Sequence, residues 1–235
     1  MDEDRDHLTT RRDSLVKAGG LLVAALGAKS VLTGGAAAAT EGTGPAAVAS
    51  GALTCVLTPE MTEGPFYVPG EKVRRNITEG RPGTPLTLKL KVVNASTCRA
   101  IKGAAVDVWH ADAGGTYSGV QGSAGTTFMR GIQPTDAKGV VEFVTVYPGW
   151  YQGRTVHIHV KVHLGGNVVH TGQLFFQDTL TDAVYKAVPY NTRGARDTRN
   201  ADDSIYVNGG KLSMLALTRS GSGYVGAIAM GVHRS

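Results

Sequence analysis

Apolar and polar residues alternate with a period of two along much of the chain after residue 85, which is the pattern of half-buried β-strands. The alternation is clearest in Leu86–Val92 and in Val156–Val162. Shorter stretches of the same kind predict five further strands, at residues 104–109, 140–146, 168–176, 211–218 and 224–232. Only residues 180–187 have the pattern of a helix, and that helix is short.

Small clusters of glycine, proline, aspartate and asparagine separate the predicted strands, as turns do. They lie at residues 136–139, 148–149, 165–166 and 208–210. Seven or so short strands joined by such turns predict an all-β fold, an antiparallel β-sandwich with short helices and long loops.

The first forty residues have the features of an export signal. The pair Arg11-Arg12 lies in a stretch that resembles a twin-arginine motif, and the apolar stretch Ala18–Ala28 follows it. Eleven apolar residues suit a signal-peptide core but fall short of the roughly 20 that span a bilayer. A buried N-terminal helix is the alternative, which Gly19-Gly20 would weaken. We therefore predict a signal peptide at 1–39, secretion, and no membrane anchor after processing.

The rest of the chain is expected to form a short stem and one folded domain. Residues 40–54 are rich in alanine, glycine and threonine, which predicts a flexible stem, and the domain is assigned to 55–235. An even number of cysteines in an exported chain favours a disulfide between Cys55 and Cys98. In the chain-entropy model a loop of this length stabilises by about 4 kcal/mol. Two buried free thiols are the alternative.

The charge of the chain points to no macromolecular partner. Its net charge is +5, and the basic residues are spread along the sequence. A nucleic-acid partner requires a basic stripe with interleaved aromatic residues, and the sequence contains none. The sequence leaves a monomer and a homodimer equally open.

Two histidines stand two residues apart in a predicted strand. Because side chains alternate across a strand, His157 and His159 project from one face, opposite to Ile158. Such a pair can bind one metal ion, although a solvent-facing or hydrogen-bonded pair is more common. The preceding segment Tyr147–Arg154 holds a Pro-Gly turn, three aromatic residues and an arginine, which favours a functional site. An aromatic plug closing the end of the fold is the alternative.

These residues form part of a longer pattern. The run from Asp136 to His159 contains the string YPGWYQGRTVHIH and resembles the core signature of the intradiol ring-cleavage dioxygenases. Three further segments agree with that family in the same order, Thr58–Tyr67, Val106–Asp112 and Gly172–Phe176. The resemblance covers residues 55 to about 180 and suggests an exported subgroup of the family.

The resemblance implies a ferric iron held by two tyrosinates and two imidazoles. The matching positions are Tyr117, Tyr151, His157 and His159. Phenolate is a hard anionic oxygen donor, which suits Fe(III), and the charge of the metal lowers the phenol pKa. The family opens the ring of catechol-type aromatics with O2 to give cis,cis-muconate-type diacids.

The resemblance also implies roles for residues beside the metal. Tyr151 matches the tyrosine that leaves the iron when substrate binds, and Arg154 matches an arginine that stabilises developing negative charge. Gln173 matches a glutamine close to that arginine, and a structural role is about equally open for it. The role of His110, which stands where several members have glutamine, is open, while Tyr147 is expected to be structural or pocket-lining.

Two rival functions remain at this stage. A ferrous or copper site would add His163 or Asp112 to the histidine pair, since it needs a carboxylate or a third histidine. A secreted binding module for carbohydrate or a protein partner would use Trp109 and Trp150 as stacking residues. Fold class alone does not separate these functions.

Overall fold

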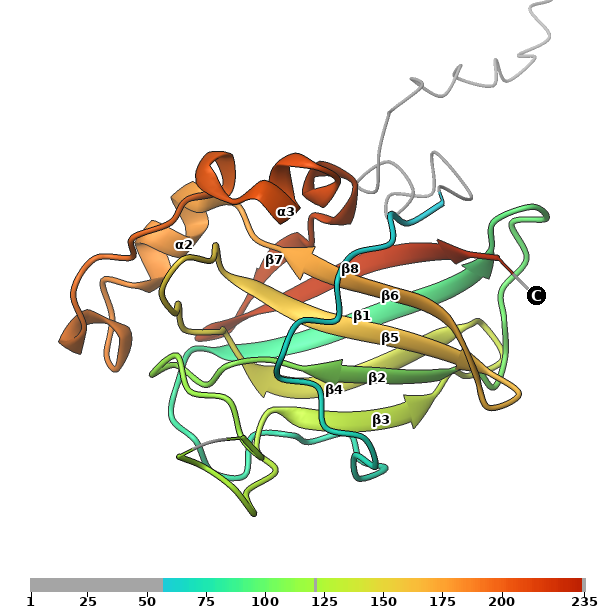
Figure 1. Ribbon diagram of the computed structural model, residues 1–235, viewed down its shortest axis with the longest axis horizontal. Helices are drawn as coiled ribbons and strands as arrows, with labels where there is room; N and C mark the ends of the chain where they lie inside the picture. Colours follow the sequence, from blue (N-terminus) through green and yellow to red (C-terminus); the bar gives the residue numbers. More distant parts are fainter. Residues whose placement is uncertain (1–56, 121, 234–235) are drawn as a thin grey trace, which may run out of the picture. The chain divides into compact units, whose positions relative to one another are not determined.

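A computed structural model describes residues 57–120 and 122–233 (Figure 1). The predicted signal peptide, the stem and Cys55 lie outside these residues, so export, the domain boundaries and the disulfide stay predictions. Among the described residues, no helix is long and apolar enough to cross a membrane.

The described part of the chain is mostly β-strand with two sheets and few helices, as the alternation predicts. The strands are β1 (Pro85–Asn94), β2 (Ala105–Trp109), β3 (Arg130–Pro134), β4 (Val140–Val146), β5 (His157–Leu164), β6 (Asn167–Phe175), β7 (Ala216–Ser220) and β8 (Gly223–Val232). The helices are α2 (Asp178–Val184) and α3 (Ser204–Val207), with 3-10 turns η1 (Tyr190–Thr192), η2 (Asn200–Asp202) and η3 (Gly210–Ser213).

One sheet has the strand order β4-β1-β8-β7 and the other β3-β2-β5-β6. The expectation of a purely antiparallel arrangement is wrong at one place, because β1 and β8 pair in parallel, from Leu86 opposite Tyr224 to Asn94 opposite Val232. Alternation assigns the two faces of a strand but carries no information about the direction of a partner more than a hundred residues away.

Other differences concern short elements. The strand expected at 211–218 begins only at Ala216, since Gly210–Ser213 forms a 3-10 turn. The expected helix at 180–187 is observed at Asp178–Val184. Strand β3 was not predicted, because its sequence RGIQP has a glycine and a proline in place of alternating apolar residues.

The hydrophobic core lies against the inner faces of both sheets. Leu88 and Leu90 of β1 are fully buried and belong to the same cluster as Val160 and Val162 of β5. The period of two therefore turns the intervening residues of β5, including His159, to the opposite face.

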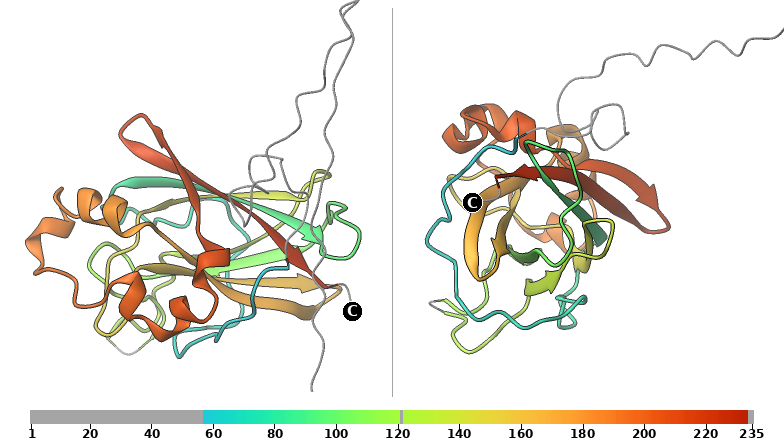
Figure 2. Two further views of the ribbon diagram at one scale, coloured as in Figure 1. Left: turned by 90° about the horizontal axis from the view of Figure 1, so that it is seen from above. Right: turned by 90° about the vertical axis from the view of Figure 1, so that its right-hand side faces the viewer.

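That outer face of the β3-β2-β5-β6 sheet is covered by the first described segment of the chain. In Figure 1 residues 57–80 cross in front of β6, β5, β2 and β3. The backbone N–H of Met61 donates to Thr171 of β6 at 2.9 Å, and that of Arg74 donates to Ile132 of β3 at 3.2 Å. The helices between β6 and β7 gather at the end of the sheets where β5 begins (Figure 2).

Candidate functional site

The two histidines on the outer face of β5 point their ring nitrogens at each other. The Nε2 atoms of His157 and His159 are 3.0 Å apart, and both side chains are buried. His157 Nδ1 lies 2.7 Å from the carbonyl oxygen of Thr155. Because a carbonyl only accepts, Nδ1 carries the proton and Nε2 keeps its lone pair. The two Nε2 atoms thus point toward one position, as two imidazoles that share a metal ion do.

Two tyrosines complete this group from separate loops. Tyr151 Oη lies 3.3 Å from His157 Nε2. The ring of Tyr117 lies 5.5 Å from that of Tyr151 and 6.1 Å from that of His159, centroid to centroid. The hydroxyl of Tyr117 is buried and lies near that of Tyr151, but makes no hydrogen bond of normal geometry among the described residues. Such a group is costly unless something satisfies it, and a cation beside the phenol oxygen would do so.

A tight turn places Tyr117 beside the second tyrosine loop. Asp112 Oδ1 accepts the backbone N–H of Thr116 at 3.0 Å and holds the turn. Gly115 has φ +80, and a Cβ at this position would lie 2.2 Å from the carbonyl oxygen of Trp150. Only glycine permits this close approach, so the sequence Gly114-Gly115 brings Tyr117 next to the loop that carries Tyr151.

The protonation of the four side chains fits a metal site. Burial lowers the pKa of His157 to about 3 and that of His159 well below its usual value, so both imidazoles are neutral, the form that binds metals. Burial raises the pKa of Tyr117 and of Tyr151, so in the absence of a metal ion both are neutral phenols. A metal would lower these pKa values and convert the phenols to phenolates. Two imidazoles and two hard oxygen donors fit ferric iron.

The alternative ferrous or copper site is not supported by the neighbouring side chains. Across residues 57–120 and 122–233, no three His, Cys, Asp or Glu side chains are grouped so that they could hold a metal. Asp112 is engaged elsewhere, with Arg81 Nη1 3.2 Å from its Oδ2.

The tryptophans of the alternative binding module are not presented for stacking on a ligand. Trp109 is fully buried and stacks on the ring of His159 at 4.9 Å and 7°. One face of Trp150 is covered by the guanidinium of Arg193, 4.3 Å from the ring centroid. A sugar-binding platform requires an exposed ring face, which Trp109 lacks.

Arg154 and Gln173 lie together, as the sequence analysis expects. Arg154 Nη2 donates to Gln173 Oε1 at 2.5 Å, and Gln173 Nε2 donates to the carbonyl of Thr62 at 2.9 Å. Gln173 is fully buried and faces His159 across the β5–β6 ladder. The arginine therefore lies at the edge of the group formed by the two tyrosines and two histidines. Gln173 of β6, which is itself bonded to the covering segment, holds it there.

Sequence reasoning missed Asp203. Its Oδ2 accepts a hydrogen bond from Arg154 Nε at 2.8 Å. A capping pattern marks Asp203 as the start of α3, because its side chain accepts from the backbone N–H groups of Ile205 and Tyr206. That signal predicts a helix start but not a contact with an arginine 49 residues earlier in the chain.

Sequence reasoning also missed the aromatic cover of the site. Phe66 stacks on Tyr117 at 4.4 Å and 23°, and meets Tyr151 edge to face at 5.7 Å. Gly64 has φ +71, and a Cβ there would lie 3.2 Å from the Cε1 atom of His159. The covering segment thus closes over the tyrosines and histidines with an apolar ring.

His110, whose role the sequence leaves open, makes structural contacts, and Tyr147, expected to be structural or pocket-lining, packs in the core. His110 Nε2 lies 2.7 Å from Thr145 Oγ1 and Nδ1 lies 2.8 Å from the carbonyl of Ala111. Burial lowers the pKa of His110 to about 4. The hydroxyl of Tyr147 lies 2.8 Å from Thr181 Oγ1, within the core.

Further along the same outer face lies a second charged group. Asp107 is 1% exposed, and burial, followed by the neighbouring carboxylate of Glu71, raises its pKa to about 8. Arg130 Nη1 lies 3.9 Å from Glu71 Oε1, and Lys161 Nζ lies 3.5 Å from the ring centroid of Tyr67. Tyr67 thus packs between this group and Trp109, with the ring centroids of Tyr67 and Trp109 4.9 Å apart.

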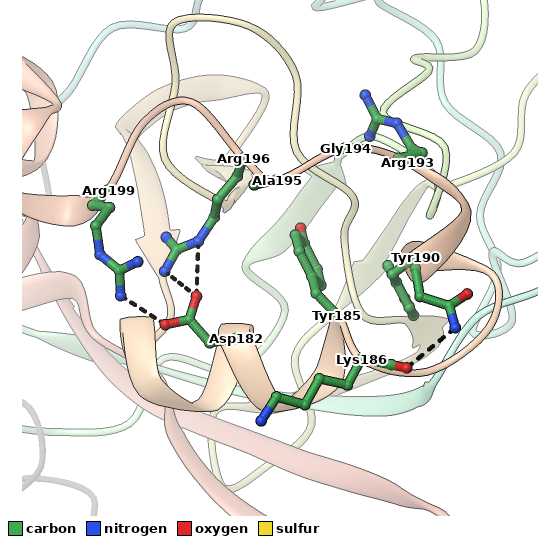
Figure 3. Close-up of a pocket in the computed structure, with 10 residues that line it drawn as sticks. Asp182, Tyr185, Lys186, Tyr190, Arg193, Gly194, Ala195, Arg196 and Arg199 are labelled. Carbon is green, nitrogen blue, oxygen red and sulfur yellow. Dashed lines mark hydrogen bonds and ion pairs between the residues drawn. The ribbon is translucent and has the colours of Figure 1, made fainter.

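A surface cavity of about 340 Å³ lies apart from these residues, beneath the loop that follows α2 (Figure 3). Two of its three arginines are paired with a carboxylate, since Arg196 Nη2 lies 2.8 Å and Arg199 Nη2 lies 2.7 Å from Asp182. None of the predicted site residues lines it.

Comparisons with known proteins identify relatives of this chain. Residues 62–202 match a family model described as dioxygenase. An intradiol ring-cleavage dioxygenase from Tetranychus urticae is 34% identical, with a TM-score of 0.71 over 76% of this chain and 95% of that one. The dioxygenase domain of a dioxygenase carbohydrate-binding fusion from Streptomyces sp. SirexAA-E is 29% identical, with a TM-score of 0.61 over 77% and 100%.

A chlorocatechol 1,2-dioxygenase from Pseudomonas putida is 26% identical over 136 residues, 49% of this chain and 52% of that protein. The chain thus spans about half the length of the curated relatives it matches. All six predicted site residues, from Tyr117 to Gln173, fall inside the segment that matches the family model.

Proposed function

Because the chain belongs to the intradiol ring-cleavage dioxygenase family, we propose that it opens the ring of a catechol-type aromatic with O2 in an iron(III)-dependent reaction. The product would be a cis,cis-muconate-type diacid. The observation that carries the proposal is the convergence of four potential ligands, with the imidazole Nε2 atoms 3.0 Å apart and a buried phenol oxygen that lacks a partner among the described residues.

The proposed ligands are Tyr117, Tyr151, His157 and His159. Ferric iron bound there would supply a Lewis acid that lowers the pKa of the substrate hydroxyls and activates the ring toward oxygen. Tyr151 Oη is suited to take up a substrate proton, because burial raises its pKa and it holds a proton once it is away from the metal.

The remaining side chains of the site would position the substrate and exclude water. Arg154 presents a positive charge beside Tyr151, where negative charge would develop on the substrate ring. Phe66 packs on both tyrosines and would exclude water from this side of the site, which would strengthen the electrostatic interactions within it.

We also propose where the enzyme acts, its oligomeric state and its fold. The twin-arginine pattern supports export to the extracellular space, where the enzyme would act on external catechols as a monomer or a homodimer. The single hydrophobic cluster with members in both sheets supports a β-sandwich.

The test is the colour and reactivity of the purified protein. Iron-loaded protein should be red from phenolate-to-iron charge transfer, and catechol added without oxygen should shift that absorption. Admission of oxygen should then consume catechol and yield the ring-opened diacid, detected by mass spectrometry. A colourless iron-loaded protein, or a visible spectrum unchanged when Tyr117 and Tyr151 are both replaced by Phe, would refute the proposal.

A further inference from the structure

We infer that Asp203 is a positioning residue for the proposed reaction, fixing the guanidinium of Arg154 in the orientation that the substrate requires. The inference rests on the proposed function and extends it to a residue beyond the segment that matches the family model, which ends at residue 202. Its basis is a set of hydrogen bonds that converge on one buried carboxylate.

The two oxygens of the Asp203 carboxylate accept hydrogen bonds from different parts of the chain. Oδ2 accepts from Arg154 Nε at 2.8 Å and from the backbone N–H of Thr155 at 2.9 Å. Oδ1 accepts from the backbone N–H groups of Ile205 and Tyr206, at 2.9 and 3.1 Å. One oxygen therefore caps α3, while the other binds the site arginine and the residue that follows it.

The surroundings of this carboxylate make the contact with Arg154 strong and directional. The side chain of Asp203 is 1% exposed and that of Arg154 is 17% exposed, so water competes little for either group. The pKa of Asp203 is lowered because the hydrogen bonds from Arg154 and from the backbone outweigh the effect of burial. A charge-assisted hydrogen bond between buried groups is shorter and stronger than a neutral one.

Asp203 and Gln173 together leave the guanidinium little freedom. Asp203 holds Nε, and Gln173 Oε1 accepts from Nη2 at 2.5 Å. Two planar contacts on two of the three nitrogens fix the plane of the group. The charge then lies beside Tyr151, whose pKa is raised by burial and lowered in part by Arg154.

The segment that carries Asp203 is itself fastened to the start of β5. Thr155 Oγ1 donates to Asn200 Oδ1 at 2.6 Å, and Asn200 Nδ2 donates to the carbonyl of Phe176 at 2.9 Å. The carboxylate is thus presented from a fixed support, which suits a residue that orients another.

The test is Asp203→Asn, which keeps the size of the side chain and an oxygen for the helix cap while removing the charge. In iron-loaded protein, turnover of catechol should fall on the order of 10- to 100-fold, since a displaced catalytic group has effects of this size. The dissociation constant for catechol under argon and the visible absorption should change far less, because the metal ligands are untouched.

A double-mutant cycle separates positioning from a structural role. In the background of Arg154→Ala, Asp203→Asn should have no further effect on turnover. In iron-free protein, the Nε–H resonance of Arg154, identified by its loss in Arg154→Lys, should be protected from exchange in the parent and unprotected in Asp203→Asn. Asp182→Asn is the matched control, since it removes a carboxylate from Arg196 and Arg199 and should leave turnover unchanged.

Parent-like turnover in Asp203→Asn would overturn the inference, as would an equal loss in both backgrounds. A folded, iron-loaded parent that does not turn over any catechol would overturn the proposed function, and this inference with it. Should Asp203→Asn fail to fold, Asp203→Ser keeps a capping oxygen and replaces it in the same cycle.

Discussion

Replacing Tyr117 by Phe should change the stability of the protein in opposite directions with and without iron. Tyr117 is 4% exposed, and its hydroxyl lies near that of Tyr151 but makes no hydrogen bond of normal geometry in the part of the chain that the structure describes. A buried polar group without a partner lowers stability by about 1–3 kcal/mol. Tyr117→Phe deletes that oxygen and keeps the stacking of the ring on Phe66. The iron-free variant should therefore be more stable than the iron-free parent.

The expected size follows from these figures. A gain of about 1–3 kcal/mol corresponds to a rise in Tm of about 2–4 °C per kcal/mol for a domain of this length. With ferric iron the sign reverses, because a ligand that binds only the folded protein stabilises it in proportion to its affinity, and the variant has lost one donor. Thermal and urea unfolding of chelator-treated and iron-loaded protein would measure both differences.

Tyr190→Phe is the matched control. The hydroxyl of Tyr190 is buried but satisfied, donating to the carbonyl of Tyr147 at 2.7 Å and accepting the backbone N–H of Thr84 at 3.0 Å. Its removal should destabilise both forms by about 1–3 kcal/mol, since one buried and one half-buried backbone group lose their partner. If iron-free Tyr117→Phe loses stability as this control does, the reasoning about the unpartnered phenol is refuted.

Four shorter predictions concern other parts of the molecule. His159→Ala should retain less iron per chain after dialysis against a chelator, and parent-like retention would remove it from the ligand set. Arg154→Ala should keep the iron and its colour yet lose about 100-fold or more in turnover; undiminished turnover would contradict this. Mass spectrometry of non-reduced protein should show Cys55 bonded to Cys98, and two alkylatable thiols in native protein would disprove it. The pKa of Asp107 is raised to about 8, so its contribution to stability is present below the unfolded pKa and is lost as pH rises toward 8. In Asp107→Asn, the free energy of unfolding measured with urea should fall less between pH 5 and 9 than in the parent. An unchanged pH profile would contradict this role of Asp107.

The local features of the fold follow from the sequence because they depend on neighbouring residues. Alternation in Val156–Val162 predicts which side chains of β5 enter the core, and the same alternation puts His157 and His159 on one face. The parallel pairing of β1 with β8 depends on a partner more than a hundred residues away, and no local pattern encodes it.

The site divides in the same way. The motifs shared with the family predict Tyr117, Tyr151 and the two histidines as site residues from the sequence alone. Phe66 and Asp203 act through contacts that span long stretches of chain, so their residue types alone do not reveal them. Asp203 shows this most clearly, since its helix cap is a local signal while its contact with Arg154 is a tertiary one.

The parallel pairing of β1 with β8 also determines when the protein can finish folding during synthesis. Every proposed site residue precedes Ser204, so the ribosome releases the complete set of proposed iron ligands before β8 has emerged. Until residues 223–232 are available, β1 lacks its neighbour on one side and the sheet stays open along that edge. Contacts of such long sequence separation form late and slowly. A nascent chain would therefore expose its proposed iron ligands before the core has closed around them, and metal capture would be most selective once β8 has paired with β1.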